Sequence, residues 1–296
     1  MSHFTVLVFG DDIESQLQPF HEFECTGIND QYVEDQDVTD DIQDRIDDGD
    51  SLGDALDWYG LNDKVVSDES EVDIEGDDCE HKYGYAIVKD GKLIKAVNRT
   101  NPNRQWDWYQ IGGRWSGFLK LKEGAKGEHG ERSWTNSDDV TALDRCDSAL
   151  KRDIDIEGMR NDAGEEAANE YDTFQSIVAG RSWESWETVR ERIEDIDEAR
   201  DFYNNQEVIK DLRKNRFFFN ISEYILTRDE YISNARNNAI STFAVLKDGV
   251  WYEKGDMGWW GCVSDEKDQG DWNAEVGRLI DSVSYDTRLT VVDCHI

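Results

Sequence analysis

Among the side chains that could bind ligands or take part in catalysis, carboxylates are the most closely clustered in this sequence. Asp35, Asp37, Asp40 and Asp41 follow one another closely enough to hold a hard cation such as Ca²⁺ or Mg²⁺. Carboxylates at this density bind cations loosely wherever they occur, so a solvated charged surface is the favoured interpretation. The sequence therefore predicts no metal site at this run.

Two further patterns resemble metal sites without completing one. Residues 153–158 (DIDIEG) resemble the first half of an EF-hand loop, but Gly164 stands where the loop needs its bidentate glutamate. Zinc requires Cys and His at ligand spacings, and the neighbouring pairs in this chain form no set of four. These pairs are His21/Cys25, Cys79/His81 and Cys294/His295.

Motifs for covalent catalysis and for nucleotide binding are missing. The chain has no Gly-x-Ser-x-Gly sequence, and no Cys or Ser lies in a motif that indicates a partner base. Walker A and GxGxxG are also absent, since the segment IGGRWSG (residues 111–117) lacks the Lys-Ser/Thr end of a P-loop. We therefore expect neither an enzyme nor a bound cofactor.

Aromatic residues are the second candidate group for binding. The cluster Trp106, Trp108, Tyr109, Trp115 and Phe118 could stack nucleic-acid bases. The negative charge of the rest of the chain opposes that function, so packing of a small sheet is the favoured interpretation.

Trp259 and Trp260 differ from that cluster, because adjacent residues on a strand face opposite sides and one ring is then exposed. Exposed Trp is a favoured anchor of protein interfaces. Together with the carboxylates of Asp37, Asp40, Asp41 and Asp44, these two residues are the predicted partner-binding set.

The charge of the 296-residue chain is −35 and is unevenly distributed. Residues 1–80 hold 26 acidic and two basic residues, whereas residues 81–136 hold 11 basic and five acidic ones. Such a field repels nucleic acid and anionic membranes and attracts basic protein surfaces. Solubility alone is the alternative explanation.

The cysteines and the apolar segments bear on the cellular compartment. Five scattered cysteines without a CxxC pair are typical of reduced thiols in a cytosol. Neither a signal sequence nor an apolar run long enough to span a bilayer is recognisable.

The expected elements place β structure at both ends and helices between them. Residues 4–9 and 289–296 read as strands, and Asp90-Gly91 and Asp248-Gly249 predict two hairpins with type I′ turns. Ile42/Ile46 and Leu52/Leu56, with Trp58 behind them, mark short amphipathic helices. A helical segment follows from Asp138 to Lys214, in which Ser182 is the expected N-cap of a second helix.

Three segments resemble a known family. HFTVLVFG (residues 3–10), PFHEFECTG (19–27) and WDWYQIGGRWSGFLKLK (106–122) are similar to a family of acidic tailed-phage proteins, the phage Gabija anti-defence family. The motifs lie in the first 120 or so residues, and the remainder is similar only in general character. The resemblance implies a non-enzymatic inhibitor that oligomerises and wraps the bacterial Gabija complex, formed by the GajA nuclease and the helicase-like GajB. It implies no individual site residues.

The sequence thus predicts an α+β protein with an N-terminal region (residues 1–136), a helical arm (137–214) and a C-terminal region (215–296), in which one sheet can hold both chain ends. The expected function is blockade of DNA binding and cleavage by Gabija in the cytoplasm of the infected bacterial host. The expected partners are that complex and further copies of the chain, without direct contact to nucleic acid or membrane. The alternative is an acidic DNA mimic that occupies DNA-binding sites of host proteins.

Overall fold

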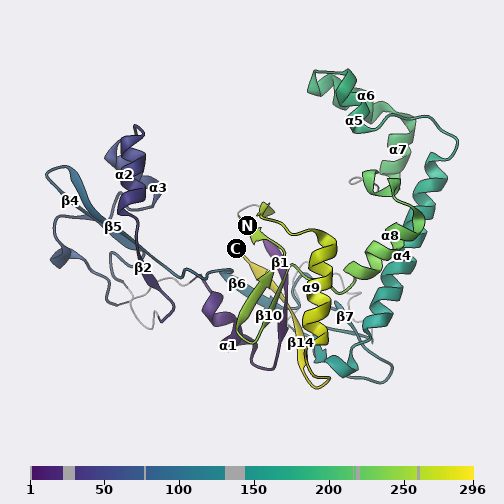
Figure 1. Cartoon of the computed structure of the whole chain (residues 1–296), viewed down its shortest axis with the longest axis horizontal. Helices are drawn as coiled ribbons and strands as arrows, with labels where there is room; N and C mark the ends of the chain where they lie inside the picture. Colours follow the sequence, from purple (N-terminus) through teal and green to yellow (C-terminus); the bar gives the residue numbers. More distant parts are fainter. Residues whose placement is uncertain are drawn as a thin grey trace.

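The protein has three parts, which Figure 1 shows side by side: an acidic lobe, a central sheet and a helical arm. The α+β class is confirmed, since helices and mixed sheets both contribute. The computed structural model describes residues 2–22, 31–76, 78–130, 144–215, 217, 221–258 and 261–296. In these ranges, no helix combines the length and the apolar character that crossing a membrane would require.

The central sheet joins the two ends of the chain. Its order is β11-β10-β1-β14-β6, with β9 also paired to β14. The strands are β1 (His3–Phe9), β6 (Trp108–Ile111), β9 (Ser148–Leu150), β10 (Ala244–Lys247), β11 (Val250–Glu253) and β14 (Arg288–His295). β1 is antiparallel to β14 along its whole length and parallel to β10. Strand pairing therefore connects the expected segments 1–136 and 215–296 in one sheet.

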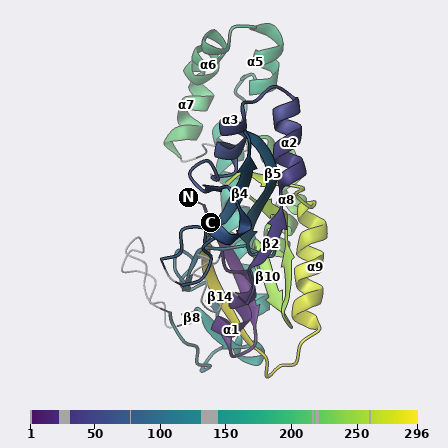
Figure 2. The same ribbon diagram turned by 90° about the vertical axis from the view of Figure 1, so that its left-hand side faces the viewer.

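Both faces of this sheet are buried, which explains the unbroken apolar run in β1. Leu7 and Phe9 belong to one core with Trp272 and Val276 of α9 (Gln269–Asp281), which lies along one side of the sheet (Figure 2). The opposite face packs against Leu17 of α1 (Ile13–Leu17) and against Trp106. The sheet is thus the centre of the two largest clusters of buried apolar residues.

Lys151 closes the C-terminal end of α9 from the neighbouring turn η4 (Lys151–Asp153). Its Nζ donates to the carbonyl oxygens of Ile280, at 2.7 Å, and Val283, at 2.9 Å. The side chain is buried, so these charge-assisted bonds replace water at two carbonyls at and just beyond the end of α9.

We expect Lys151→Met to lower the free energy of unfolding by about 2–3 kcal/mol, because two buried hydrogen bonds from a charged donor are lost. Lys122→Met is the matched control: Lys122 is exposed and donates to the Arg152 carbonyl oxygen, and its loss should cost less than about 0.5 kcal/mol. Urea unfolding followed by circular dichroism measures both. Equal losses in the two variants would contradict the capping role of Lys151.

The acidic lobe (residues 31–100) is a separate sheet with two helices on one face. Its strand order is β2-β5-β4-β3. The elements are β2 (Glu34–Asp37), α2 (Thr39–Asp47), α3 (Leu52–Trp58), β3 (Val65–Val66), η2 (Glu69–Glu71), β4 (Gly84–Lys89) and β5 (Lys92–Thr100). Ile42 and Leu56 pack on Ala86 and Ala96 in a small core. Asp90 and Gly91 both have positive φ, as the predicted type I′ turn requires.

The helical arm (residues 156–238) carries the remaining helices. They are α4 (Ile156–Val178), α5 (Trp186–Arg192), α6 (Ile196–Asn205), α7 (Glu207–Lys214), η5 (Ile221–Ile225) and α8 (Arg228–Asn238). Phe174, Leu212, Phe217 and Tyr224 form its core, so the arm extends beyond residue 214. Ser185, rather than the expected Ser182, caps the second helix, because its hydroxyl accepts from the Thr188 N–H.

Short elements complete the described chain. They are η1 (Gln18–Phe20), β7 (Leu119–Lys120), β8 (Arg145–Cys146), β12 (Asp256–Met257) and β13 (Val263–Ser264). β7 pairs with β8 and β12 with β13. The predicted helical segment begins at Asp138, outside the described residues, and it is wrong over residues 144–155, where β8, β9 and η4 precede α4. In that stretch Asp155 of the EF-hand-like sequence acts as the N-cap of α4 and accepts from the Gly158 N–H.

Candidate functional site

Three of the predicted partner-binding carboxylates lie together in the acidic lobe. Asp37, Asp40 and Asp41 line a hollow of about 910 Å³, which we call the acidic hollow. Asp44 lies one turn further along α2, exposed and outside the lining. Trp259 and Trp260 fall outside the described residues, so their prediction as partner contacts stays a prediction.

The first wall of the acidic hollow is the junction between β2 and α2. Asp37 accepts a hydrogen bond from the Thr39 N–H at 3.0 Å, while the Thr39 hydroxyl accepts from the Ala96 N–H of β5 at 2.8 Å. These bonds fix the start of α2 against the sheet. Asp40 and Asp41 occupy the first helical turn, where the helix dipole stabilises negative charge.

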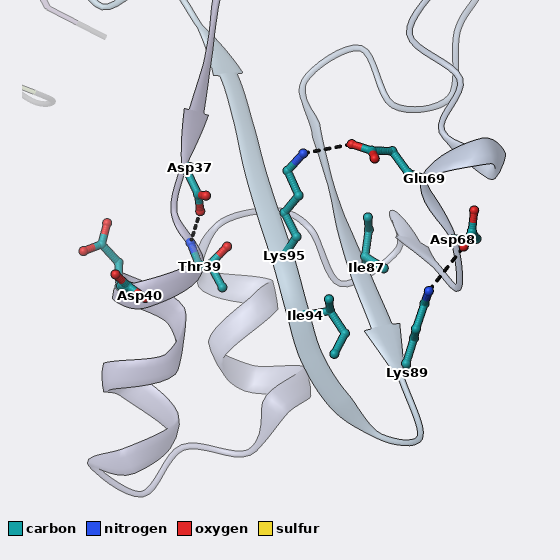
Figure 3. Close-up of a pocket in the computed structure, with 10 residues that line it drawn as sticks. Asp37, Thr39, Asp40, Asp68, Glu69, Ile87, Lys89, Ile94 and Lys95 are labelled. Carbon is teal, nitrogen blue, oxygen red and sulfur yellow. Dashed lines mark hydrogen bonds and ion pairs between the residues drawn. The ribbon is translucent and has the colours of Figure 1, made fainter.

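The second wall is made of ion pairs, which Figure 3 shows. Lys89 Nζ lies 3.2 Å from Asp68 Oδ2, and Lys95 Nζ lies 2.9 Å from Glu69 Oε1. Ile87 and Ile94 contribute apolar surface between the walls. Each lysine thus neutralises a carboxylate of its own wall.

The charges of the acidic hollow do not balance. Within the described part of the chain, Asp37, Asp40 and Asp41 form no ion pair. Hydrogen bonds from Thr39 lower the pKa of Asp37, and bonds from the Ser70 N–H and from Lys89 lower the pKa of Asp68. These carboxylates therefore stay ionised at neutral pH, and the hollow has an uncompensated negative wall.

This arrangement suits binding of cations more than acid–base catalysis. A general acid working near pH 7 needs a carboxyl group with a raised pKa, and the shifts of Asp37 and Asp68 run in the opposite direction. Among the described residues, no three His, Cys, Asp or Glu side chains gather in an arrangement able to hold a metal ion. What the hollow offers is attraction for Lys or Arg side chains, whose aliphatic stems can lie on Ile87 and Ile94.

A second polar cluster lies beneath the glycine-rich motif, and the sequence did not reveal it. Asp147 is completely buried and accepts from the Gly117 N–H at 2.6 Å, the Gly130 N–H at 2.8 Å and the Ser116 hydroxyl at 3.2 Å. Asp293 on β14 is also buried and accepts from the Arg114 N–H at 2.9 Å. The glycine loop therefore wraps two carboxylates.

Histidines extend this cluster along the end of the sheet. His3 Nδ1 lies 2.8 Å from Asp293 Oδ1, and His295 Nδ1 lies 2.6 Å from Asp107 Oδ1. The two imidazole rings, on paired positions of β1 and β14, are 4.9 Å apart between centroids. These contacts tie the two chain ends to each other and tie the C-terminal strand to Asp107, just before β6, which is a structural function.

Two of the described thiols, those of Cys146 and Cys294, are poorly suited to nucleophilic chemistry. Burial raises the pKa of Cys146 to about 11 and raises the pKa of Cys294 well above its usual value. A nucleophilic cysteine needs the opposite shift, toward the thiolate. Cys79 is buried as well, and Cys262 is exposed.

The aromatic cluster of residues 106–118 serves mainly as packing. Trp106 is buried and donates to the Leu17 carbonyl oxygen, while Trp115 and Phe118 rest on the core beneath α9. Trp108 is half exposed.

Comparison with known protein families, curated proteins and solved structures gives no match to this chain.

Proposed function

We propose that this protein is a phage-encoded inhibitor of the bacterial Gabija defence system, which acts in the cytoplasm of the infected host. It binds the nuclease complex as a homo-oligomer and keeps DNA from the complex, without making or breaking covalent bonds. The sequence segments that resemble the Gabija anti-defence family supply the identity of the target.

The observation that supports this proposal most directly is the acidic lobe. It has its own sheet and core, and it carries 21 acidic against seven basic residues. Its carboxylates are exposed on α2 and around the acidic hollow. A nuclease must present basic residues to DNA, and such a surface attracts this lobe.

The arrangement of the parts also suits a protein that surrounds its target. Figure 1 shows the acidic lobe and the helical arm projecting on opposite sides of the central sheet, with the two termini between them. Two separate projections can contact different parts of one large complex, and contacts made together by one molecule strengthen each other.

Complex formation is the first test. Purified protein is mixed with purified Gabija complex and analysed by size-exclusion chromatography and native mass spectrometry. We expect one stable assembly that contains several copies of this chain, and the mass gives their number. Separate elution of the two components at micromolar concentrations would remove the proposal.

The DNA-mimic alternative is favoured by the spacing of carboxylates on α2. Asp40, Asp44 and Asp47 follow at four- and three-residue steps, so they form an exposed row on one helix face. A mimic that imitates phosphates would bind unrelated DNA-binding proteins with a steep dependence on salt. Binding to Gabija but not to such proteins favours wrapping, whereas comparable binding to both favours mimicry.

A further inference from the structure

Trp58 is the most exposed large aromatic side chain among the described residues of the acidic lobe. Trp58, the last residue of α3, has 71% of its surface accessible. The buried residues of this helix are Ala55 and Leu56, and each helical residue turns by about 100°, so Trp58 falls outside the buried stripe. The sequence pattern alone made it part of the apolar set, whereas the structure places it in solvent.

Trp58 is held in place by the cation of the neighbouring helix. The Arg45 guanidinium lies 4.5 Å from the ring centroid, and Arg45 Nη2 is 2.6 Å from Asp50 Oδ2. A cation above a Trp face is attracted by the ring. The indole therefore has one supported face and one open face, and an ordered side chain loses little entropy when a partner binds.

The surroundings of the ring are acidic. Asp54 lies one turn before Trp58 on α3, Asp41 lies one turn before Arg45 on α2, and Asp48 is the C-cap of α2; all three are exposed. Arg45 is one of only two basic residues among the first 80, and Asp50 neutralises it. We call Trp58, Arg45, Asp41, Asp48 and Asp54 the Trp58 face; through Asp41 it continues into the acidic hollow.

We propose that the Trp58 face is the anchoring contact of the acidic lobe, and that its partner is a protein surface with an apolar pocket surrounded by Lys and Arg. This inference rests on the proposed function and assigns the contact to the DNA-binding surface of the nuclease complex. The indole enters the pocket, and the carboxylates pair with the cations around it.

Charge favours a basic protein surface as the partner of the Trp58 face over a nucleic acid or a second copy of this chain. A nucleic acid could stack a base on the open indole face, but its phosphates would meet the carboxylates around it, and stacking sites combine aromatic rings with cations. A second copy docked through the same face would bring carboxylates against carboxylates. A basic protein surface matches both the ring and its acidic surroundings.

The test compares Trp58→Ala with Tyr285→Ala. Tyr285, outside the acidic lobe, is equally exposed at 71% and is the matched control. We expect Trp58→Ala to weaken binding to the purified Gabija complex about thirtyfold through faster dissociation, which is typical of a buried aromatic anchor, and Trp58→Phe to retain part of the affinity. Tyr285→Ala should bind as the wild type does.

Biolayer interferometry at several salt concentrations gives the rates, and unchanged urea midpoints show that the variants fold. Because the ring carries no charge, the salt dependence of association should persist in Trp58→Ala.

If Trp58→Ala binds as tightly as Tyr285→Ala, the inference is wrong while the proposed function stands. A changed native mass of the Trp58→Ala protein without Gabija would show that the Trp58 face contacts another copy of this chain, and this would also overturn the inference. If the wild type itself does not bind, the proposed function and this inference fall together.

Discussion

Gly113→Ala should destabilise the protein by about 3–5 kcal/mol. Gly113 has a φ of +49°, and a Cβ there would overlap the side chain of Asp293. Asp293 cannot move aside, because it is buried between the Arg114 N–H and His3. Strain of the left-handed backbone and overpacking thus add to each other.

Gly124→Ala is the control for this substitution. Gly124 has a φ of +76°, and a Cβ there would meet nothing within 4 Å, so only the backbone strain of about 1 kcal/mol remains. Urea unfolding of both variants gives the difference. Equal losses would show that the glycine loop does not depend on its fit around the buried carboxylate.

Neutralising the predicted carboxylates should have the largest effect on binding. We expect the quadruple variant Asp37→Asn, Asp40→Asn, Asp41→Asn and Asp44→Asn to bind the Gabija complex about a hundredfold more weakly, mainly through slower association at low salt. The fold should persist, because in the described chain none of the four forms an ion pair and an Asn at position 37 can still accept from the Thr39 N–H.

An equal change of charge elsewhere is the control. Glu123, Glu165, Glu166 and Glu191 are exposed outside the acidic lobe, and their replacement by Gln removes the same four charges. Affinities measured from 50 to 300 mM salt separate the two sets. The same weakening in both would mean that total charge, and not the acidic lobe, directs binding.

Much of the fold could be predicted because its signals are local. The strand at residues 4–9 and both Asp-Gly hairpins follow from short patterns of apolar residues and turn chemistry. The pairing of β1 with β14 is different, since it joins His3 to His295 at the other end of the chain. Only the general expectation that one sheet holds both ends could be drawn from the sequence.

The candidate site, too, could be predicted where its residues are close in the sequence, but not where they are distant. Asp37, Asp40 and Asp41 lie together because they are close in the sequence, whereas the opposite wall with Lys89 and Lys95 needs the folded lobe. The glycines of the 106–122 motif could be recognised in the sequence, but the buried carboxylates that they pack around could not. Asp147 lies 30 residues from Gly117, and Asp293 lies 179 residues from Arg114, and nothing in a local pattern links them.

Cleavage of DNA by the purified Gabija complex, measured against increasing amounts of this protein, tests whether the protein blocks the nuclease without covalent chemistry. We expect cleavage to stop once the protein saturates the complex, DNA to bind no longer, and both components to be recovered chemically unchanged. Full cleavage at saturating protein, or a covalent change in the complex or its DNA produced by this chain alone, would contradict this expectation.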